Sequence, residues 1–391
     1  MKLLFSTYSL VLLFLFVLFF FLSKTTLVRK PRRYLLFVSL CLSIMAFLFN
    51  PIKGWETNGN YTDLYRFYSD MKIFQTVGWN GNSAEFRTEY NTIPVIKVLV
   101  YSIAQIGVFG LLASLTCAFV YGLFGKLALK LSRDEELRPQ VAIMAFLMFV
   151  ALANYKAVIT NIRMPIGMVI FLIVSYYDLI REKRNLWVIL GYISLLGIHS
   201  VFIIFIVVRV LSILMKKYSA WIICLIAVTS GTMLTYIVGI LQRFESNAYV
   251  DSILYKIAYY TVGTKSDYSE PSIVFLGVIK IVTMIVMILY LSKHKVDVYN
   301  RYKRFIEFGL LFSMVCIGTA WNYYLFMRMT NYLWLLIPML YIMLKCENRE
   351  ASHGSRFSLV NKNTVNFVLY STLILHLVYY FLSYQYRVLC F

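Results

Sequence analysis

Long apolar runs alternate with short polar stretches along almost the whole chain. An apolar run of about 20 residues forms a helix long enough to cross the hydrocarbon core of a bilayer, which is about 30 Å thick. We predict such helices over 3–22, 34–50, 140–158, 164–180, 219–241, 272–292, 305–326, 329–345 and 364–387. The pattern therefore predicts an all-α, polytopic integral membrane protein.

Two further apolar runs do not fit one helix each. The run 93–129 is too long for one span, so we predict an interfacial helix from Ile93 to about Ile103, followed by a span to about Leu127. The run 186–215 has cations on both flanks, and a single span would leave one cluster outside. We therefore predict two short helices that meet near Gly197-Ile198-His199. The total is about 12 transmembrane helices (about 11–13) in a single transmembrane domain over 1–391.

Lysine and arginine in the short loops set the predicted orientation, because cytoplasmic loops are enriched in both. The basic loops are 24–33, 126–138, 181–185 and 293–304. With these loops in the cytoplasm, the two longest polar segments, 51–92 and 242–271, face outward, as do both termini. These two segments would form the roof of a site at the outer face.

Composition supports the membrane interpretation and excludes several classes of protein. Hydrophobic residues make up 60% of the chain and charged residues 14%, with a mean hydropathy of +0.72; soluble domains average about 25% charged residues. A soluble enzyme and a disordered chain are therefore excluded. The net charge of +20 comes from 38 basic and 18 acidic residues, and because the basic residues lie mostly between apolar runs we expect no nucleic-acid partner.

Several familiar motifs are missing from the sequence. The six cysteines are scattered without a CxxC pair, which predicts neither a zinc site nor a disulfide framework. There is no GxxxxGK[ST] loop, no HExxH and no DxD pair. We therefore expect no cofactor, no bound metal and no nucleotide-sugar donor.

Polar residues inside or beside the apolar runs are the candidates for chemistry, since a charge in a bilayer usually faces a cavity or a partner. Arg163 opens the run 164–180, and Pro165 suits the first turn of a helix. Together with the helix N-terminus, Arg163 would bind an anion; an arginine that only reaches to the headgroups is the alternative. His199 is expected in the outer half of the membrane, as a general base or as a packing residue. We interpret His376 as structural.

Further candidates lie on the predicted outer side. Arg328 falls between two apolar runs with Tyr332 one helical turn later, and a second cation there would suit a diphosphate. A simple loop arginine is the alternative. The outer segments mix carboxylates, cations and aromatic rings, as sugar sites do, although tyrosines also gather at membrane interfaces. The residues expected to bind substrate in these segments are Asp63, Tyr65, Arg66, Glu89, Arg243 and Tyr260.

The order of these features resembles the EpsG-like branch of the Wzy-type bacterial polysaccharide polymerases. Members of this branch carry short motifs in a fixed order along a chain of many spans. The matching positions are Asp63-Leu64-Tyr65 in the first outer segment, Glu89-Tyr90 before a long helix, Arg163-Met164 where the family has an Arg-Gln pair, His199-Ser200, and Arg328 with Tyr332.

The resemblance implies a glycosyltransferase of the C-type superfamily in the bacterial cytoplasmic membrane. Its substrate would be an oligosaccharide repeat unit on undecaprenyl diphosphate, polymerised at the outer face without metal or nucleotide. Arg163 and Arg328, with Arg243 as a weaker candidate, would hold the diphosphate. His199, or a carboxylate of Asp63 or Glu89, would take the proton of the acceptor hydroxyl, and inversion at the anomeric carbon is expected.

Partners and alternatives follow from the same interpretation. The expected partners are the lipid-linked oligosaccharide and the lipid bilayer, with a chain-length regulator protein as a further candidate. An O-antigen ligase would use the same arginines with a different acceptor. A transporter or flippase of lipid-linked sugars would instead line a path through the bilayer with cations. A structural membrane subunit without chemistry is the remaining alternative.

Overall fold

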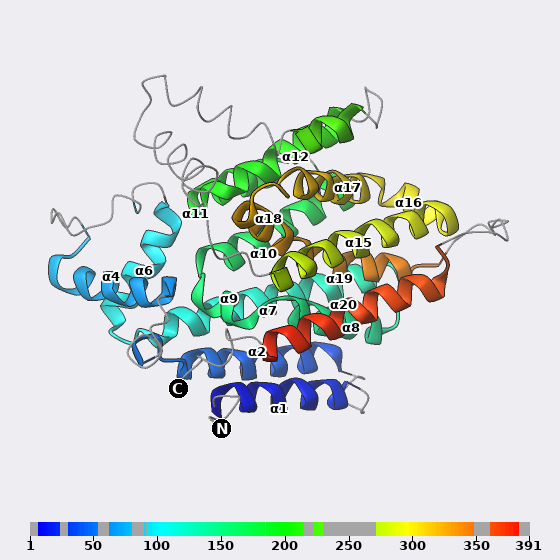
Figure 1. Cartoon of the computed structure of the whole chain (residues 1–391). Helices are drawn as coiled ribbons and strands as arrows, with labels where there is room; N and C mark the ends of the chain where they lie inside the picture. The colour runs from blue at the N-terminus through cyan, green and yellow to red at the C-terminus, as the bar shows by residue number, and fades with distance from the viewer. Residues whose placement is uncertain are drawn as a thin grey trace, which may run out of the picture. The chain divides into compact units, whose positions relative to one another are not determined.

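Helices make up the regular structure of this chain. The computed structural model describes residues 7–23, 30–53, 62–79, 90, 93–183, 185–214, 222–229, 271–347 and 360–382, and these contain helices and no strand (Figure 1). The predicted all-α class is therefore confirmed for the described residues. Among them, five helical stretches are long and apolar enough to cross a membrane: Pro31–Leu48, Gly110–Asp134, Arg163–Ile180, Val274–His294 and Leu325–Lys345.

Contacts divide the chain into two compact units. The first unit comprises Met1–Ile173, Gly197–His199 and Leu373–Phe391, and the second comprises Val174–Leu196 and Ser200–Thr372. The single transmembrane domain over 1–391 stays a prediction, as does the total of about 12 spans.

Prolines mark where several helices of the first unit begin. Pro31, Pro94 and Pro139 are each the first residue of their helix, where a missing N–H costs no hydrogen bond and the fixed φ suits the first turn. The elements of this unit are α1 (Thr7–Leu22), α2 (Pro31–Leu48), α4 (Asp63–Val77), α6 (Pro94–Ile106), α7 (Gly110–Asp134), α8 (Pro139–Leu152), α9 (Tyr155–Thr160) and the first part of α10 (Arg163–Ser175).

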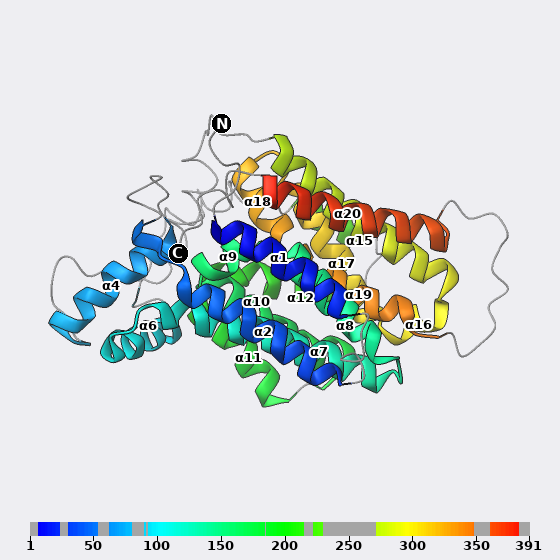
Figure 2. The same cartoon turned by 90° about the horizontal axis from the view of Figure 1, so that it is seen from below.

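Helices α2, α7 and α8 form the core of the first unit, and α2 runs beside α7 in both views (Figures 1 and 2). The rings of Phe124 and Phe149 stack with centroids 3.9 Å apart. The hydroxyl of Tyr155 donates to the carbonyl of Leu42 over 2.8 Å, which satisfies a buried polar group without water. This packing fixes α9, and with it the start of α10, against α2.

The second unit is built around α15. Its elements are η2 (Tyr176–Ile180), most of α11 (Leu186–Ile198), η3 (Ser200–Phe202), α12 (Ile203–Leu214), α15 (Pro271–His294), α16 (Val296–Arg301), α17 (Lys303–Gly318), α18 (Tyr323–Asn331), α19 (Leu333–Lys345) and the first part of α20 (Lys362–Leu382). Helix α15 approaches α18 most closely at Gly277, where an added Cβ would lie 2.7 Å from the ring of Phe326. The hydroxyls of Thr283 and Thr372 hydrogen-bond over 2.7 Å and tie α15 to α20.

Two unusual runs divide as their patterns predict. The run 93–129 breaks at Gly107, a few residues after the predicted end of its first helix, where the φ of +79° ends α6 before α7 begins. The run 186–215 breaks at His199, between α11 of 13 residues and α12 of 12 residues. At about 1.5 Å per residue neither helix alone would cross a bilayer.

Several predicted boundaries are wrong. The run 140–158 ends as a helix at Leu152, and the separate short helix α9 follows. The predicted loop 126–138 is helical as far as Asp134. The predicted loop 293–304 contains the short helix α16. Of the predicted helix 219–241, residues 222–229 are described and helical.

Candidate active site

The first outer segment contains a helix that begins at the predicted Asp-Leu-Tyr motif. The hydroxyl of Thr62 accepts from the backbone N–H of Tyr65 over 3.2 Å and caps α4. Asp63 lies in the first turn, where the helix dipole stabilises its negative charge. Asp63 also forms an ion pair with Arg66, one turn later. The start of α4 therefore presents a carboxylate and a guanidinium together, both of which are half-buried.

One face of α4 is both acidic and aromatic. Asp63, Phe67, Asp70 and Phe74 are spaced by four, three and four residues, which places them on one side of the helix. Asp70 is 6% exposed, and the hydroxyl of Tyr90 donates to it over 2.8 Å. That hydrogen bond offsets the cost of burying a carboxylate. We call these four residues the α4 face.

Arg163 lies against the α4 face. It is the first residue of α10, as the sequence predicts, and Pro165 falls in the first turn. Its guanidinium carbon lies 5.9 Å from the ring centroid of Phe67, within the range of a cation–π contact. Because Phe67 lies between Asp63 and Asp70 on α4, the structure brings Arg163 to the first outer segment.

The loop that carries His199 reaches the same unit through α6. His199 is half-buried directly after α11. Two residues earlier, Gly197 lies so close to the start of α6 that an added Cβ would be 3.6 Å from Val95. The chain just before α6 carries Tyr90, whose hydroxyl binds Asp70. The end of α11 therefore contacts the start of α6, and Tyr90, which precedes α6, contacts the α4 face.

Lys156 is a titratable group that the sequence interpretation missed. It lies on α9, which contacts α4 and is not one of the membrane-length helices. The amine of Lys156 is half-buried, and it is a further candidate base beside His199, Asp63 and Glu89.

Arg328 and Tyr332 belong to the second unit. Asn322 caps α18 by accepting from the N–H of Leu325 over 3.0 Å, so Arg328 is helical and half-buried rather than part of a loop. Tyr332 follows the helix and is 1% exposed. Its ring meets that of Phe205 edge-on with centroids 4.7 Å apart. Tyr332 thus packs in this aromatic core, one helical turn after Arg328, and its predicted role in substrate binding stays a prediction.

A buried lysine lies next to the Arg328 helix. Lys280, on α15, is 3% exposed, and its amine donates to the side-chain oxygen of Asn331 over 3.1 Å. A single lysine inside the apolar run 272–292 is the sequence signal that could have identified it, because a charge at that depth needs a partner. Lys280 therefore contacts α18, the helix that carries Arg328.

The second unit also contains a buried ion pair that sequence reasoning missed. Arg209 on α12 binds Asp178 through Nε at 2.5 Å and Nη2 at 2.9 Å. Tyr192 on α11 donates to the same carboxylate over 3.0 Å. Asp178 lies in η2, a π-helical turn that directly continues α10. We call these three residues the clamp, because they join η2, α11 and α12.

Three predicted site residues, Glu89, Arg243 and Tyr260, lie outside the described residues. Among the residues that are described, no group of three His, Cys, Asp or Glu side chains could hold a metal ion. The candidate chemistry therefore rests on two sets, one in each unit. The first set is Asp63, Arg66, Asp70, Lys156, Arg163 and His199, and the second is Lys280, Arg328 and Tyr332.

Comparison with known proteins adds no relative to this picture. No protein-family model matches the chain, and neither a curated protein nor a solved structure matches it.

Proposed function

We propose that this protein is a membrane glycosyltransferase that polymerises oligosaccharide repeat units carried on undecaprenyl diphosphate. The reaction takes place at the outer face of a bacterial cytoplasmic membrane that the chain crosses about 12 times. The proposal follows the resemblance to the EpsG-like polymerases. The membrane-length helices and the polar residues beside them are compatible with it.

The observation that carries the proposal is the position of Arg163 on the α4 face. A guanidinium at a helix N-terminus, over an aromatic ring, suits a lipid-linked diphosphate at headgroup level. The neighbouring carboxylate of Asp63 can accept hydrogen bonds from sugar hydroxyls, and Phe67 offers a ring to an apolar sugar face. Groups suited to an anion, to sugar hydroxyls and to an apolar sugar face thus lie on α4 and at the start of α10.

The chemistry requires one displacement and one proton transfer. The acceptor hydroxyl oxygen bonds to the anomeric carbon of the growing chain while the bond from that carbon to the diphosphate oxygen breaks. Undecaprenyl diphosphate leaves with the electron pair, and its charge is stabilised by Arg163 and Arg328. The hydroxyl proton passes to His199 or to a carboxylate of Asp63 or Glu89, with Lys156 as a further candidate. Direct displacement inverts the anomeric configuration.

Purified protein with one defined undecaprenyl-diphosphate repeat unit tests this function. We expect a ladder of products in the presence of EDTA and without nucleotide. Arg163→Ala, His199→Ala and Arg328→Ala should abolish the ladder while the purified yield stays unchanged. Lys72→Ala is the matched control, because Lys72 is an exposed cation on α4 away from the α4 face.

The competing functions give different results in the same experiment. A ligase would transfer the sugar once to another acceptor and form no ladder. A flippase would form no new glycosidic bond but would move the lipid-linked sugar across a vesicle membrane. A full-length ladder in both Arg163→Ala and His199→Ala would refute the proposed mechanism.

A further inference from the structure

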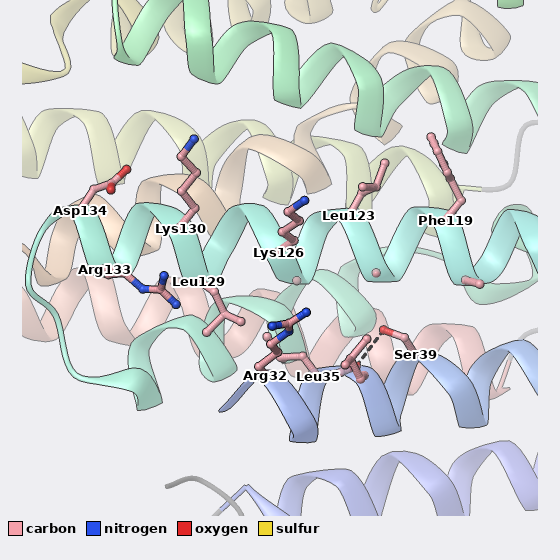
Figure 3. Close-up of a pocket in the computed structure, with 14 residues that line it drawn as sticks. Arg32, Leu35, Ser39, Phe119, Leu123, Lys126, Leu129, Lys130, Arg133 and Asp134 are labelled. Atoms are coloured by element: carbon pink, nitrogen blue, oxygen red, sulfur yellow. Dashed lines mark hydrogen bonds between the residues drawn. The ribbon is translucent and has the colours of Figure 1, made fainter. Parts of the chain in front are cut away.

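A hollow of about 660 Å³ lies between α2 and α7 in the first unit (Figure 3). Four cations and one carboxylate, Asp134, are among the residues that line it. We call it the basic hollow, and its defining residues are Arg32, Leu36, Phe119, Lys126, Lys130 and Arg133.

The polar and apolar parts of the basic hollow follow each other along one stripe of α7. Lys126, Lys130 and Arg133 are spaced by four and three residues, so they share a helix face. Continuing the same stripe toward the start of α7 leads to Phe119 and Gly122, which also line the hollow. Figure 3 shows the cations at one end of the hollow and Phe119 with Leu123 at the other. The site therefore has a charged end and an apolar end.

The charged end is built from both helices. Arg32 lies in the first turn of α2, and Figure 3 shows its guanidinium turned toward the part of α7 that carries Lys126. No side chain caps this end of α2, so the helix dipole adds to the positive charge. Among the described residues, none forms a hydrogen bond or ion pair with the side chains of Arg32, Lys126 or Arg133. An anion with several oxygens is the complementary ligand.

The apolar end is open to a hydrocarbon chain. Leu36 is 56% exposed and Phe119 is 40% exposed. A Cβ added at Gly122 would meet no atom within 4 Å, so the glycine leaves an open trench between these two side chains. Exposed apolar side chains beside a membrane-length helix are normal contacts for lipid tails.

The length of α7 places the charged end at headgroup depth. Its 25 residues span about 37 Å, more than the hydrocarbon thickness of about 30 Å. The excess of about 7 Å places Lys130 and Arg133 in the headgroup layer, and Lys126, one turn earlier, reaches the same layer with its long side chain. The basic loop 24–33 precedes α2, so the predicted side is the cytoplasmic one.

We infer that the basic hollow binds an anionic phospholipid of the cytoplasmic leaflet. The phosphate lies between Arg32 and Lys126, and an acyl chain lies along Gly122 and Phe119. A free phosphate would explain the cations but not the continuous apolar trench, and basic pockets between transmembrane helices are suited to anionic headgroups. The inference shares no residue with the proposed active site, so either can fail without the other.

Binding of fluorescent phosphatidylglycerol and phosphatidylcholine to the full-length protein in detergent tests the inference. We expect phosphatidylglycerol to bind at least about tenfold more tightly, since each nearby cation contributes about fivefold. Arg32→Gln with Lys126→Gln should remove this preference. Gly122→Leu should fill the trench and weaken binding while leaving all four cations in place. Arg138→Gln is the matched control, because Arg138 is exposed just after α7 and does not line the hollow.

Each other result overturns the inference. Equal affinity for the two lipids would show that no anionic site exists. An equal loss with Arg138→Gln would show diffuse surface charge instead of a site. Displacement of the lipid by inorganic phosphate, with no effect of Gly122→Leu, would show a site for a soluble anion. Thermal unfolding of every variant identifies misfolded protein, and in that case retention of phosphatidylglycerol by the wild type in native mass spectrometry decides the question.

Discussion

Arg163 and Arg209 are both arginines among apolar helices, but their surroundings differ. Arg209 is 8% exposed and is held by two hydrogen bonds to Asp178. Arg163 is half-buried over the ring of Phe67, at the start of its helix. A bidentate carboxylate fixes a guanidinium and neutralises it, whereas a ring attracts the cation and leaves its charge in place.

On the proposed function, Arg209 serves the fold and Arg163 serves the ligand, so removing each arginine should have a different effect. Removing one member of a buried ion pair leaves an uncompensated charge, so the clamp should respond strongly in stability. A cation over a ring contributes little to folding but can bind an incoming anion. Variants of the clamp should therefore lose stability, and variants of Arg163 should lose activity, when both quantities are measured on the same proteins.

Loss of the clamp carboxylate should produce the largest effect on stability. Asp178→Ala leaves Arg209 buried and without its partner, and we expect the free energy of unfolding to fall by about 3–5 kcal/mol. Denaturant unfolding in detergent measures this change. Asp178→Ala combined with Arg209→Met should recover part of the loss, and a double variant as unstable as the single one would show that the pair is not coupled.

Arg163 should show the opposite pattern. In Arg163→Ala we expect the elongation rate to fall by about 10²–10³-fold, as for the loss of one transition-state donor. The free energy of unfolding should change by less than about 1 kcal/mol, the size of a cation–π contact. Arg163→Lys keeps the charge without the planar fork and should retain intermediate activity. A large loss of stability in Arg163→Ala would remove the contrast with Arg209.

The hydrogen bond from Tyr90 to Asp70 should have a smaller effect. Tyr90→Phe leaves a buried carboxylate without this donor, which costs about 1–3 kcal/mol. Thermal unfolding detects the change, and Tyr101→Phe is a control because Tyr101 packs against the same Phe74 ring. If the two variants unfold alike, packing rather than the hydrogen bond holds Tyr90.

The helix cap at Thr62 should give the smallest effect. Thr62→Ala removes the acceptor for the N–H of Tyr65 and should cost about 1 kcal/mol, while Thr62→Ser should cost less. Comparing unfolding midpoints of the two variants measures this difference. Equal destabilisation by serine and alanine would show that the methyl group of Thr62, rather than its hydroxyl, stabilises α4.

The sequence predicted features that depend on local chemistry. The flanking cations predicted two short helices in the run 186–215, and the chain does break at His199 between α11 and α12. The position of Arg163 at a helix start also followed from its neighbours, since Pro165 cannot occupy a helix interior without cost.

Contacts between segments that are distant along the chain could not be predicted from the sequence. Asp178 and Arg209 are separated by two helices, and Lys280 meets Asn331 across a longer interval. Nothing in the local pattern of either residue selects its partner, because the choice depends on how helices pack. For Arg328 the sequence left two alternatives, a helical face shared with Tyr332 and a loop, and the helix that begins after the cap at Asn322 contains Arg328.

The π-helical turn at Tyr176–Ile180 makes the clamp sensitive to chain length. Such a turn accommodates one residue more than a regular α-helix. Deleting a single amino acid within it would restore α-helical geometry, and a different residue could then take the place of Asp178 on the side that meets Arg209 of α12. Insertions and deletions in this turn should therefore be tolerated far less than substitutions on its outward side.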